Sequence, residues 1–388
     1  MVMRPTDRSI YLDNASTTRV VPEAEGAMLT CLREDFGNPS SAHRMGIEAS
    51  RRIKSAREAV LSALGDDRGA FGQVLWTSGG TEADALGVMG AARARKGHGR
   101  HVVATAIEHP AVLGSLDLLA AEGFETTLVP VEPSGVVSPE KMAGAVRRDT
   151  VVVACMLVNN EIGTIQPVAE VARAVRGERR DVHIHCDAVQ AVGKIPVDVR
   201  GLGVDTLALS AHKLHGPKGV GALWLRKGAR LSPLWSGGGQ EQGLRSGTEN
   251  VPGIFALGVA IGLAVGSLAE EMARVAELRA RFANRVLGQG LGAWENGSDA
   301  PRVPHVLSLS FPGLTAEPLL HALEGRGVFL SAGSACSSKE RGQSHVLRAI
   351  GVPDGAGTLR VSLARDVTAD DVDTAAEVLV EEARTLAR

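Results

Sequence analysis

Short apolar runs alternate with longer helical stretches through the first two thirds of this 388-residue chain. This order of elements is typical of a mostly parallel sheet that helices cover on both faces. Helices are predicted between the strands, for example over Ile47–Leu64 and Glu82–Arg95. The strands are predicted over Val74–Thr77, His101–Thr105, Thr126–Val129, Thr150–Met156, His183–Asp187 and Thr206–Ser210.

Beyond Thr248 the pattern changes to a long helical run over Ile254–Leu287. We expect a helix of this length to join one domain to another. It is followed by shorter apolar runs, which predict strands over Val306–Phe311 and Thr358–Ala364. These elements predict a second, smaller α+β domain.

A final helix is predicted to begin at Thr368, because Asp371 stands three residues further on, as in a capping box. We therefore expect a large domain over residues 16–255. A small domain is expected to combine residues 1–15 with residues 256–388.

The composition is that of an ordinary folded protein, with 44% hydrophobic and 22% charged residues. A net charge of -2 gives no electrostatic reason to expect binding to nucleic acid or to an anionic membrane. The longest apolar stretch, Ile254–Leu268, is shorter than the ~20 residues of a membrane span, so we expect a core helix. The first residues lack the apolar core of a signal peptide, and the 4 cysteines show no metal-type spacing. These features predict a protein of the reducing cytoplasm.

Lys213 lies between two apolar runs in the segment Leu207–Leu225. Such a lysine commonly belongs to a surface turn. At the end of a buried strand, however, burial favours the neutral amine, which is the form that attacks a carbonyl carbon. Gly216, Gly219 and Gly221 allow the backbone to pass close to a bulky group. Lys213 is therefore a candidate for a lysine that binds a carbonyl compound.

The segment VLWTSGGTEADALGV predicts a strand that ends at Thr77, a glycine-rich turn, and a helix that begins near Thr81 or Glu82. Free amides at a helix N-terminus attract anions, so this turn is a candidate phosphate site; a plain strand-to-helix turn is the alternative. The chain lacks both the GxxxxGK[ST] and the GxGxxG patterns. A phosphate-bearing ligand of another kind is therefore expected.

Asp187 ends a mostly apolar strand and so brings a carboxylate to the carboxyl edge of the sheet, where ligands of open α/β folds bind. Alone, Asp187 would be interpreted as a helix cap, and a histidine after a strand, such as His109, is commonly structural. Together with Lys213 and the phosphate site, they match the needs of pyridoxal phosphate. The amine forms a Schiff base, the carboxylate keeps the pyridine nitrogen protonated, and an imidazole can lie on the ring or pass protons.

Cys336 stands in the segment FLSAGSACSSKERGQSHVLRAIG, among small and polar residues without apolar periodicity. Lys339 and Arg341 follow it, which predicts an exposed, locally basic loop where a thiolate forms more easily than in a core. An incidental surface cysteine is the alternative. The remaining cysteines lie within helical or strand patterns and are interpreted as structural.

A series of motifs follows in order along the chain: YLDNASTT, FGNPSSAHRMG, TSGGTEADALGV, VNNEIGTIQP, HCDAVQAVGKIPVDV, LSAHKLHGPKGVGAL, GGGQEQGLRSGTEN, SAGSACSS and LRVSLAR. In this order they resemble the cysteine desulfurases of the NifS/IscS type, within the class V aminotransferases. The resemblance runs almost end to end. It implies the α/β architecture of fold type I pyridoxal phosphate-dependent transferases, with a large, mostly parallel sheet domain and a smaller α+β domain.

The resemblance implies roles for individual residues. Lys213 resembles the Schiff-base lysine, Asp187 the partner of the pyridine nitrogen, and His109 the stacking residue that shuttles protons. Cys336 resembles the nucleophile, in a loop of the longer kind, and is also a candidate transient iron–sulfur ligand. Further cofactor ligands are implied at Gly80, Thr81, Asn160, Gln190, Ser210, His212 and Thr248, and substrate ligands at Asn38, Asn160 and Arg360.

The implied reaction removes sulfur from L-cysteine, leaves L-alanine and places the sulfur on Cys336 as a persulfide. The acceptor would be an iron–sulfur scaffold or a tRNA-thiolation protein. Thr248 resembles a residue that completes the phosphate site of the neighbouring subunit, which implies a homodimer. A selenocysteine lyase, or another class V lyase or transaminase, would use the same cofactor. A non-catalytic relative that serves only as a binding partner would be expected to lack Lys213 or Cys336, and both are present.

Overall fold

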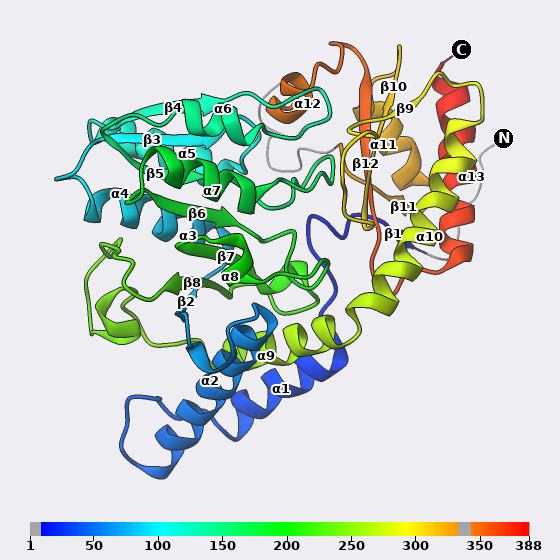
Figure 1. Ribbon diagram of the computed structural model, residues 1–388. Coiled ribbons are helices and arrows are strands. Elements are labelled where there is room, and N and C mark those ends of the chain that lie inside the picture. Colours follow the sequence, from blue (N-terminus) through cyan, green and yellow to red (C-terminus); the bar gives the residue numbers. More distant parts are fainter. Residues whose placement is uncertain (1–8, 333–342, 388) are drawn as a thin grey trace.

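The computed structural model describes residues 9–332 and 343–387. Its largest element is a 7-stranded sheet in the order β2-β8-β7-β6-β5-β3-β4 (Figure 1). Within this sheet β8 is antiparallel to both of its neighbours and the other pairings are parallel. The strands are β2 (Gly72–Thr77), β3 (His101–Thr105), β4 (Glu125–Val129), β5 (Thr150–Ala154), β6 (His183–Asp187), β7 (Thr206–Ser210) and β8 (Gly221–Arg226).

Alternate residues of these strands enter two different cores, one on each face of the sheet. Val74 and Trp76 of β2 belong to one core, whereas Leu75 between them belongs to the other. Because both faces are covered, the strands appear in the sequence as continuous apolar runs. The first core packs against α1 (Pro22–Arg33), α2 (Arg44–Ala63), α6 (Pro139–Gly144), α7 (Val168–Glu178), α8 (Val199–Leu202) and α9 (Val251–Gly266), and the second against α3 (Gly80–Ala85), α4 (Ala91–Ala94) and α5 (Pro110–Ala121).

A smaller layer of strands and helices has a core of its own. An antiparallel sheet in the order β12-β10-β9 lies beside a parallel pair of β1 and β11. Ile10 and Leu12, near the N-terminus, are buried in this core, and this segment thus packs with residues far along the chain. The elements are β1 (Ile10–Tyr11), α10 (Leu268–Leu287), β9 (Trp294–Glu295), β10 (Val306–Phe311), α11 (Ala316–Gly325), β11 (Val328–Phe329), β12 (Gly357–Ser362) and α13 (Ala369–Leu386). Between β11 and β12 the chain also forms α12 (His345–Ala349), which packs instead in the core of the large sheet.

The single long helix expected over Ile254–Leu287 is wrong. The chain forms α9 and α10, which bend by 72° at their junction. Ser267 lies at this junction, and its hydroxyl donates to the carbonyl oxygen of Leu263. The two helices pack in different cores: Ile261 lies in the core of the large sheet and Phe282 in that of the small one. The bend thus lies where the chain passes from one core to the other.

Two other predicted helical features can be compared with the structure, the helix over Glu82–Arg95 and the capping box at Thr368. The helix expected over Glu82–Arg95 consists of α3, a π turn at Leu86–Gly90, and α4. The capping box is confirmed, since Thr368 and Asp371 exchange side-chain to backbone hydrogen bonds at the start of α13. In the described part of the chain no single helix is long and apolar enough to cross a membrane; only the bent pair α9 and α10, taken together, meets that criterion.

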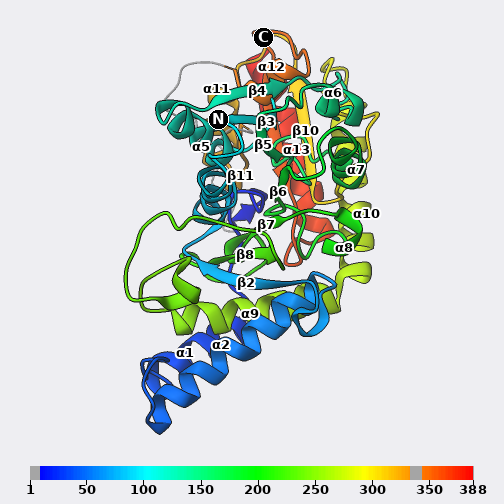
Figure 2. The same ribbon diagram turned by 60° about the vertical axis from the view of Figure 1, so that its left-hand side comes forward.

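The parallel strands all end at the same edge of the large sheet. β2 runs in the same direction as β7, because both are antiparallel to β8. The loops that follow β2, β3, β5, β6 and β7 therefore meet at one edge, beside the small sheet (Figure 1). α1 and α2 project as an arm from the β2 end of the large sheet, beside α9 (Figure 2).

Candidate active site

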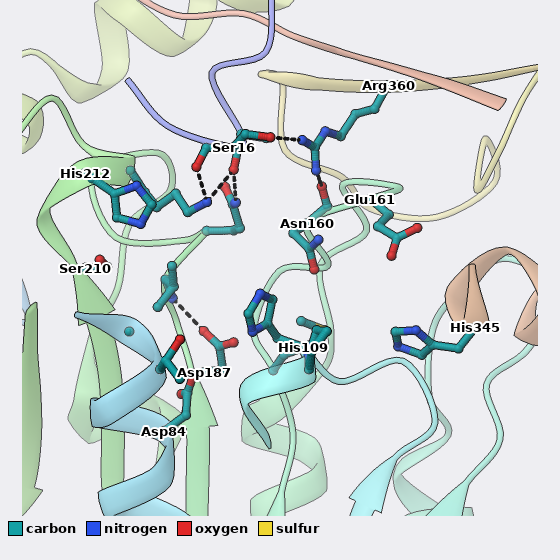
Figure 3. A pocket seen from close by; sticks show the side chains of 18 residues that line it. Ser16, Asp84, His109, Asn160, Glu161, Asp187, Ser210, His212, His345 and Arg360 are labelled. Carbon is teal, nitrogen blue, oxygen red and sulfur yellow. Dashed lines mark hydrogen bonds between the residues drawn. The ribbon is translucent and has the colours of Figure 1, made fainter. Parts of the chain in front are cut away.

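A cavity of about 270 Å³ lies at the carboxyl edge of the large sheet, with Arg360 of the small sheet on its other side (Figure 3). It gathers side chains that follow several different strands. Those predicted from the sequence that line it are Gly80, Thr81, His109, Asn160, Asp187, Gln190, Ser210, His212, Lys213 and Arg360.

Lys213 lies in the short turn after β7, and its amine is held by the N-terminal segment. Its Nζ donates to the carbonyl oxygen of Ala15 at 2.7 Å and to that of Ser16 at 2.6 Å. The loop after β1 therefore forms one wall of the cavity (Figure 3).

Asp187 at the end of β6 is buried beside a second carboxyl group, that of Asp84 on α3. The backbone N–H of Val189 donates to Asp187 Oδ1 at 2.9 Å. One ligand atom each of Asp84, Asp187 and His109 lies within 4.8 Å of the others. Burial, followed by the charge of Asp187, raises the pKa of Asp84 well above its ordinary value. Two buried carboxylates so close do not ionise together, and we assign the proton to Asp84.

Asp84 begins a row of buried polar groups on the face of the sheet that α3 covers. His185 Nε2 lies 3.2 Å from Asp84 Oδ1, and its Nδ1 lies 3.0 Å from the hydroxyl of Thr206. His183 Nε2 lies 2.8 Å from the same hydroxyl. Burial lowers the pKa of His185 to about 3, so its ring is neutral. The sequence contained a signal for Asp84, which stands three residues after Thr81 and so shares its face of the helix.

His109 caps the N-terminus of α5. The backbone N–H of Ala111 donates to His109 Nδ1 at 3.1 Å. Because this nitrogen accepts, the neutral ring carries its proton on Nε2. Burial lowers the pKa of His109, which keeps the ring neutral around pH 7. The residue can therefore donate a hydrogen bond into the cavity without taking up a proton first.

Arg360 reaches the cavity from β12 with only 2% of its surface exposed. Its Nη2 donates to Asp13 Oδ1 at 2.9 Å and to Ser16 Oγ at 2.6 Å. Its Nη1 donates to the backbone oxygen of Asn160 at 2.9 Å (Figure 3). The guanidinium group thus connects the N-terminal segment to the loop after β5. Asp13 and Ser16 lie in the motif YLDNASTT, but sequence reasoning gave them no role.

The part of the cavity next to Ser210 and the start of α3 contains groups that can bind an anion. Ser210 Oγ is buried and has no hydrogen-bond partner among the described residues. The first turn of α3 begins at Gly80, where a Cβ would lie only 2.8 Å from Val189 Cγ2. The ring of His212 is neutral, because burial and the charges of Lys213 and Lys218 lower its pKa to about 4.

Two predicted residues, Thr248 and Asn38, do not line this cavity. Thr248 is exposed and lines a separate hollow. Asn38 is exposed in the turn between α1 and α2, where its Oδ1 accepts from the backbone N–H of Ser40 at 2.9 Å. Cys336 lies outside the described residues. The functional roles of all three stay predictions.

Two further titratable lining residues, Glu161 and His345, were missed, and they lie on the side away from His212 (Figure 3). Burial raises the pKa of Glu161. His345 Nε2 donates to the backbone oxygen of Glu108 at 3.0 Å, and so ties α12 to the loop that carries His109. Glu161 lies within the motif VNNEIGTIQP, whereas nothing in the sequence pattern connects His345 to the loop of Glu108, from which 237 residues separate it.

A family model for class V aminotransferases matches residues 10–374. The chain belongs to the class V aminotransferase family. A cysteine desulfurase IscS of Methanosarcina thermophila is 41% identical over 377 residues, which cover 97% of this chain and 92% of that protein. Members of this family are pyridoxal phosphate enzymes, and the predicted family and fold class are confirmed.

Solved structures agree with this membership of the class V aminotransferases. One described as a NifS-like protein has a TM-score of 0.89 at 38% identity, and covers 96% of this chain and 99% of that one. Another, described as SspA in complex with cysteine, has a TM-score of 0.81 at 31% identity, with coverage of 92% and 99%.

Proposed function

We propose that this class V aminotransferase is a cysteine desulfurase that takes sulfur from L-cysteine, releases L-alanine and carries the sulfur as a persulfide on Cys336. The observation that carries the proposal is the meeting of Lys213, Asp187, His109 and Arg360 around one cavity. The relative from Methanosarcina thermophila bears the name of this activity, and it matches the chain along nearly its full length.

The residues present fit pyridoxal phosphate. The buried hydroxyl of Ser210 has no partner among the described residues, and the first amides of α3 have no helical acceptor. A phosphate supplies acceptors for both. Asp187 supplies an anion for a pyridinium nitrogen, and Lys213 supplies an amine for an aldehyde. When bound, the cofactor supplies a ring that withdraws electrons from the substrate carbon next to the amino group.

The chain's own residues orient the substrate and handle protons. We assign Arg360 to the substrate carboxylate, because a guanidinium can form two parallel hydrogen bonds with it. Asn160 and Gln190 are assigned to polar groups of the cofactor and substrate. His109 Nε2 carries a proton that it can donate, and Asp187 holds the proton of the ring nitrogen, while Asp84 beside it stays neutral.

Cys336 is assigned as the sulfur carrier from the motif SAGSACSS. Its thiolate attacks the substrate sulfur, so that an S–S bond forms and the C–S bond breaks. The electron pair of the C–S bond stays with the carbon, which takes up a proton and becomes the methyl group of alanine. A free thiolate carrier requires a reducing compartment such as the cytoplasm. The outer sulfur then passes to an acceptor, for which we propose an iron–sulfur scaffold or a tRNA-thiolation protein.

We further propose a homodimer in which Thr248 reaches the phosphate site of the partner subunit. Thr248 is exposed and lies apart from the cavity of its own chain. The arm of α1 and α2 also exposes large apolar side chains of the kind that a subunit interface covers. These are Leu29, Leu32, Phe36, Met45 and Ile47.

The test uses the purified protein loaded with pyridoxal phosphate. It should be yellow and should release sulfide from L-cysteine in the presence of a reductant. Lys213→Ala should lose the visible band that depends on the lysine, whereas Cys336→Ala should keep the band and lose sulfide release. Full desulfurase activity in Cys336→Ala would refute the carrier assignment. Turnover of selenocysteine by that variant would instead favour a selenocysteine lyase.

A further inference from the structure

Lys194 is a buried lysine that the proposed reaction does not use. It lies in the turn after β6 with 8% of its surface exposed. Its Nζ donates to Gln190 Oε1 at 3.0 Å. It lines a small cavity behind the site, together with Lys213 and His305.

The position of Lys194 is electrostatically unfavourable. Burial, followed by the charges of Lys213 and Arg360, lowers the pKa of Lys194 to about 7. His305 and His212 are also close enough for the charge of Lys194 to lower their pKa values. No carboxylate contributes to the pKa of Lys194 among the described residues. A methionine would fill the same space without the cost of burying an amine.

The contacts of Lys194 fix the orientation of the Gln190 amide. The charged form of Lys194 can only donate, so the oxygen of the Gln190 amide faces it. The amide nitrogen, Nε2, donates to the carbonyl oxygen of Ala15 at 2.8 Å, and a carbonyl can only accept. Both neighbours therefore require the same orientation, in which the amide NH₂ lies on the side of Ala15.

This orientation couples Gln190 to Lys213. The carbonyl oxygen of Ala15 accepts from Gln190 and also from Lys213 Nζ at 2.7 Å. The NH₂ group has two hydrogens, and one of them is used by Ala15. Because Gln190 lines the main cavity, the second hydrogen is left for a ligand. A reversed amide would present an oxygen there instead.

We propose that Lys194 is a positioning residue, which holds the amide of Gln190 so that an N–H donor, and not an oxygen, faces the ligand beside Lys213. The inference rests on the proposed pyridoxal phosphate site. Lys194 acts through Gln190 and makes no contact of its own with the cofactor or substrate.

The experiment is a double-mutant cycle on the holoenzyme, with Lys194→Met, Gln190→Leu and the double variant. The visible absorbance of the bound cofactor is titrated with pH, without substrate. We expect Lys194→Met and Gln190→Leu each to raise the midpoint by about one pH unit. The first variant no longer holds the amide N–H toward the cofactor and the second removes it, so both weaken a hydrogen bond that stabilises the less protonated form of the cofactor. The double variant should show the shift of Gln190→Leu alone, since interacting sites are not additive.

Controls separate this role from a purely structural one. Lys194→Arg keeps a donor, so its titration midpoint should lie close to that of the wild-type protein. Lys141→Met, at an exposed lysine paired with Glu132, should leave it unchanged. A shift that adds fully to that of Gln190→Leu, or no shift in a folded Lys194→Met protein, would overturn the inference. If the wild-type protein binds no pyridoxal phosphate, the proposed function fails instead, and the two failures are thus distinguishable. Should Lys194→Met not fold, Lys194→Leu, which also lacks a donor, is titrated in its place with the same expectations.

Discussion

Lys213 Nζ lies 2.7 Å from the carbonyl oxygen of Ala15, although 198 residues separate the two along the chain. The amine that is proposed to bind the cofactor thus contacts the backbone of the N-terminal segment. A carbonyl oxygen attracts the amine without neutralising a positive charge, so the amine can exchange this partner for a ligand at modest cost.

Arg360→Lys should weaken use of L-cysteine, because a lysine cannot form the paired hydrogen bonds of a guanidinium. We expect kcat/KM to fall on the order of 100-fold, or about 2.7 kcal/mol, mainly through KM. Steady-state sulfide release measures the effect. Arg348→Lys, at an exposed arginine on α12, is the matched control. A KM unchanged in Arg360→Lys would contradict the carboxylate assignment.

Gly87→Ala should destabilise the fold. A Cβ at this position would lie 2.3 Å from His185 Nδ1, the atom that contacts Thr206. Relief requires movement of a packed ring, and we expect a loss of about 1–3 kcal/mol in the free energy of unfolding. Gly114→Ala on α5 is the control, because no atom lies within 4 Å of its added Cβ. It should be neutral or stabilising by up to ~1 kcal/mol. Equal denaturation midpoints for the two variants would contradict this packing argument.

Glu108→Gln should remove a pH-dependent loss of stability. Burial raises the pKa of Glu108 to about 8 in the folded chain, against about 4.3 when unfolded. Between these values the folded state holds the extra proton, so its stability is greatest below the unfolded pKa. It falls by up to about 1.4 kcal/mol per pH unit until pH 8. Glutamine keeps the acceptor that Thr105 and Met156 contact at 2.7 and 2.8 Å.

Urea unfolding between pH 5 and pH 9 checks the role of Glu108. The variant should lose less stability than the wild type as the pH rises through this window. Glu132→Gln, at an exposed carboxylate, should follow the wild type. Parallel curves for wild type and Glu108→Gln would show that Glu108 ionises normally.

Subunit complementation should reveal whether Thr248 acts across an interface. Thr248→Glu and Lys213→Ala should each be inactive alone, the first because its carboxylate repels the phosphate. Mixed dimers should recover activity, because one site then combines an intact Lys213 with an intact Thr248 of the partner subunit. Sulfide release after refolding a mixture measures the recovery. Absence of activity in mixed dimers would place Thr248 in the site of its own chain.

The sequence predicted those features that depend on near neighbours. The capping box of Thr368 and Asp371 is a local pattern. The inner strands β5, β6 and β7 were predicted because burial on both faces makes them mostly apolar. The bend at Ser267 was missed because the adjoining segments look equally helical, and only their different cores separate them. His345 was missed for the same kind of reason: its place beside the cavity is set by the packing of α12, not by its own neighbours in the chain.

The residues of the candidate site also divide into those that the sequence could predict and those that depend on tertiary packing. The strand-end residues Asp187, Lys213 and His109 could be placed together because parallel strands end at one edge. Lys194 could not, because its proposed role comes from the amide of Gln190, which the folded chain brings to it. Asp84 shares a helix face with Thr81, but its burial beside Asp187 follows only from the packing of α3 on the sheet.

Arg360 fastens the N-terminal segment, through Asp13 and Ser16, to the loop that carries Asn160. A substrate carboxylate that binds the guanidinium group of Arg360 must compete with these hydrogen-bond partners. Substrate binding and the loss of these hydrogen bonds are therefore coupled. Any change that strengthens the contacts of Arg360 with the two loops is expected to lower the affinity for the amino acid substrate.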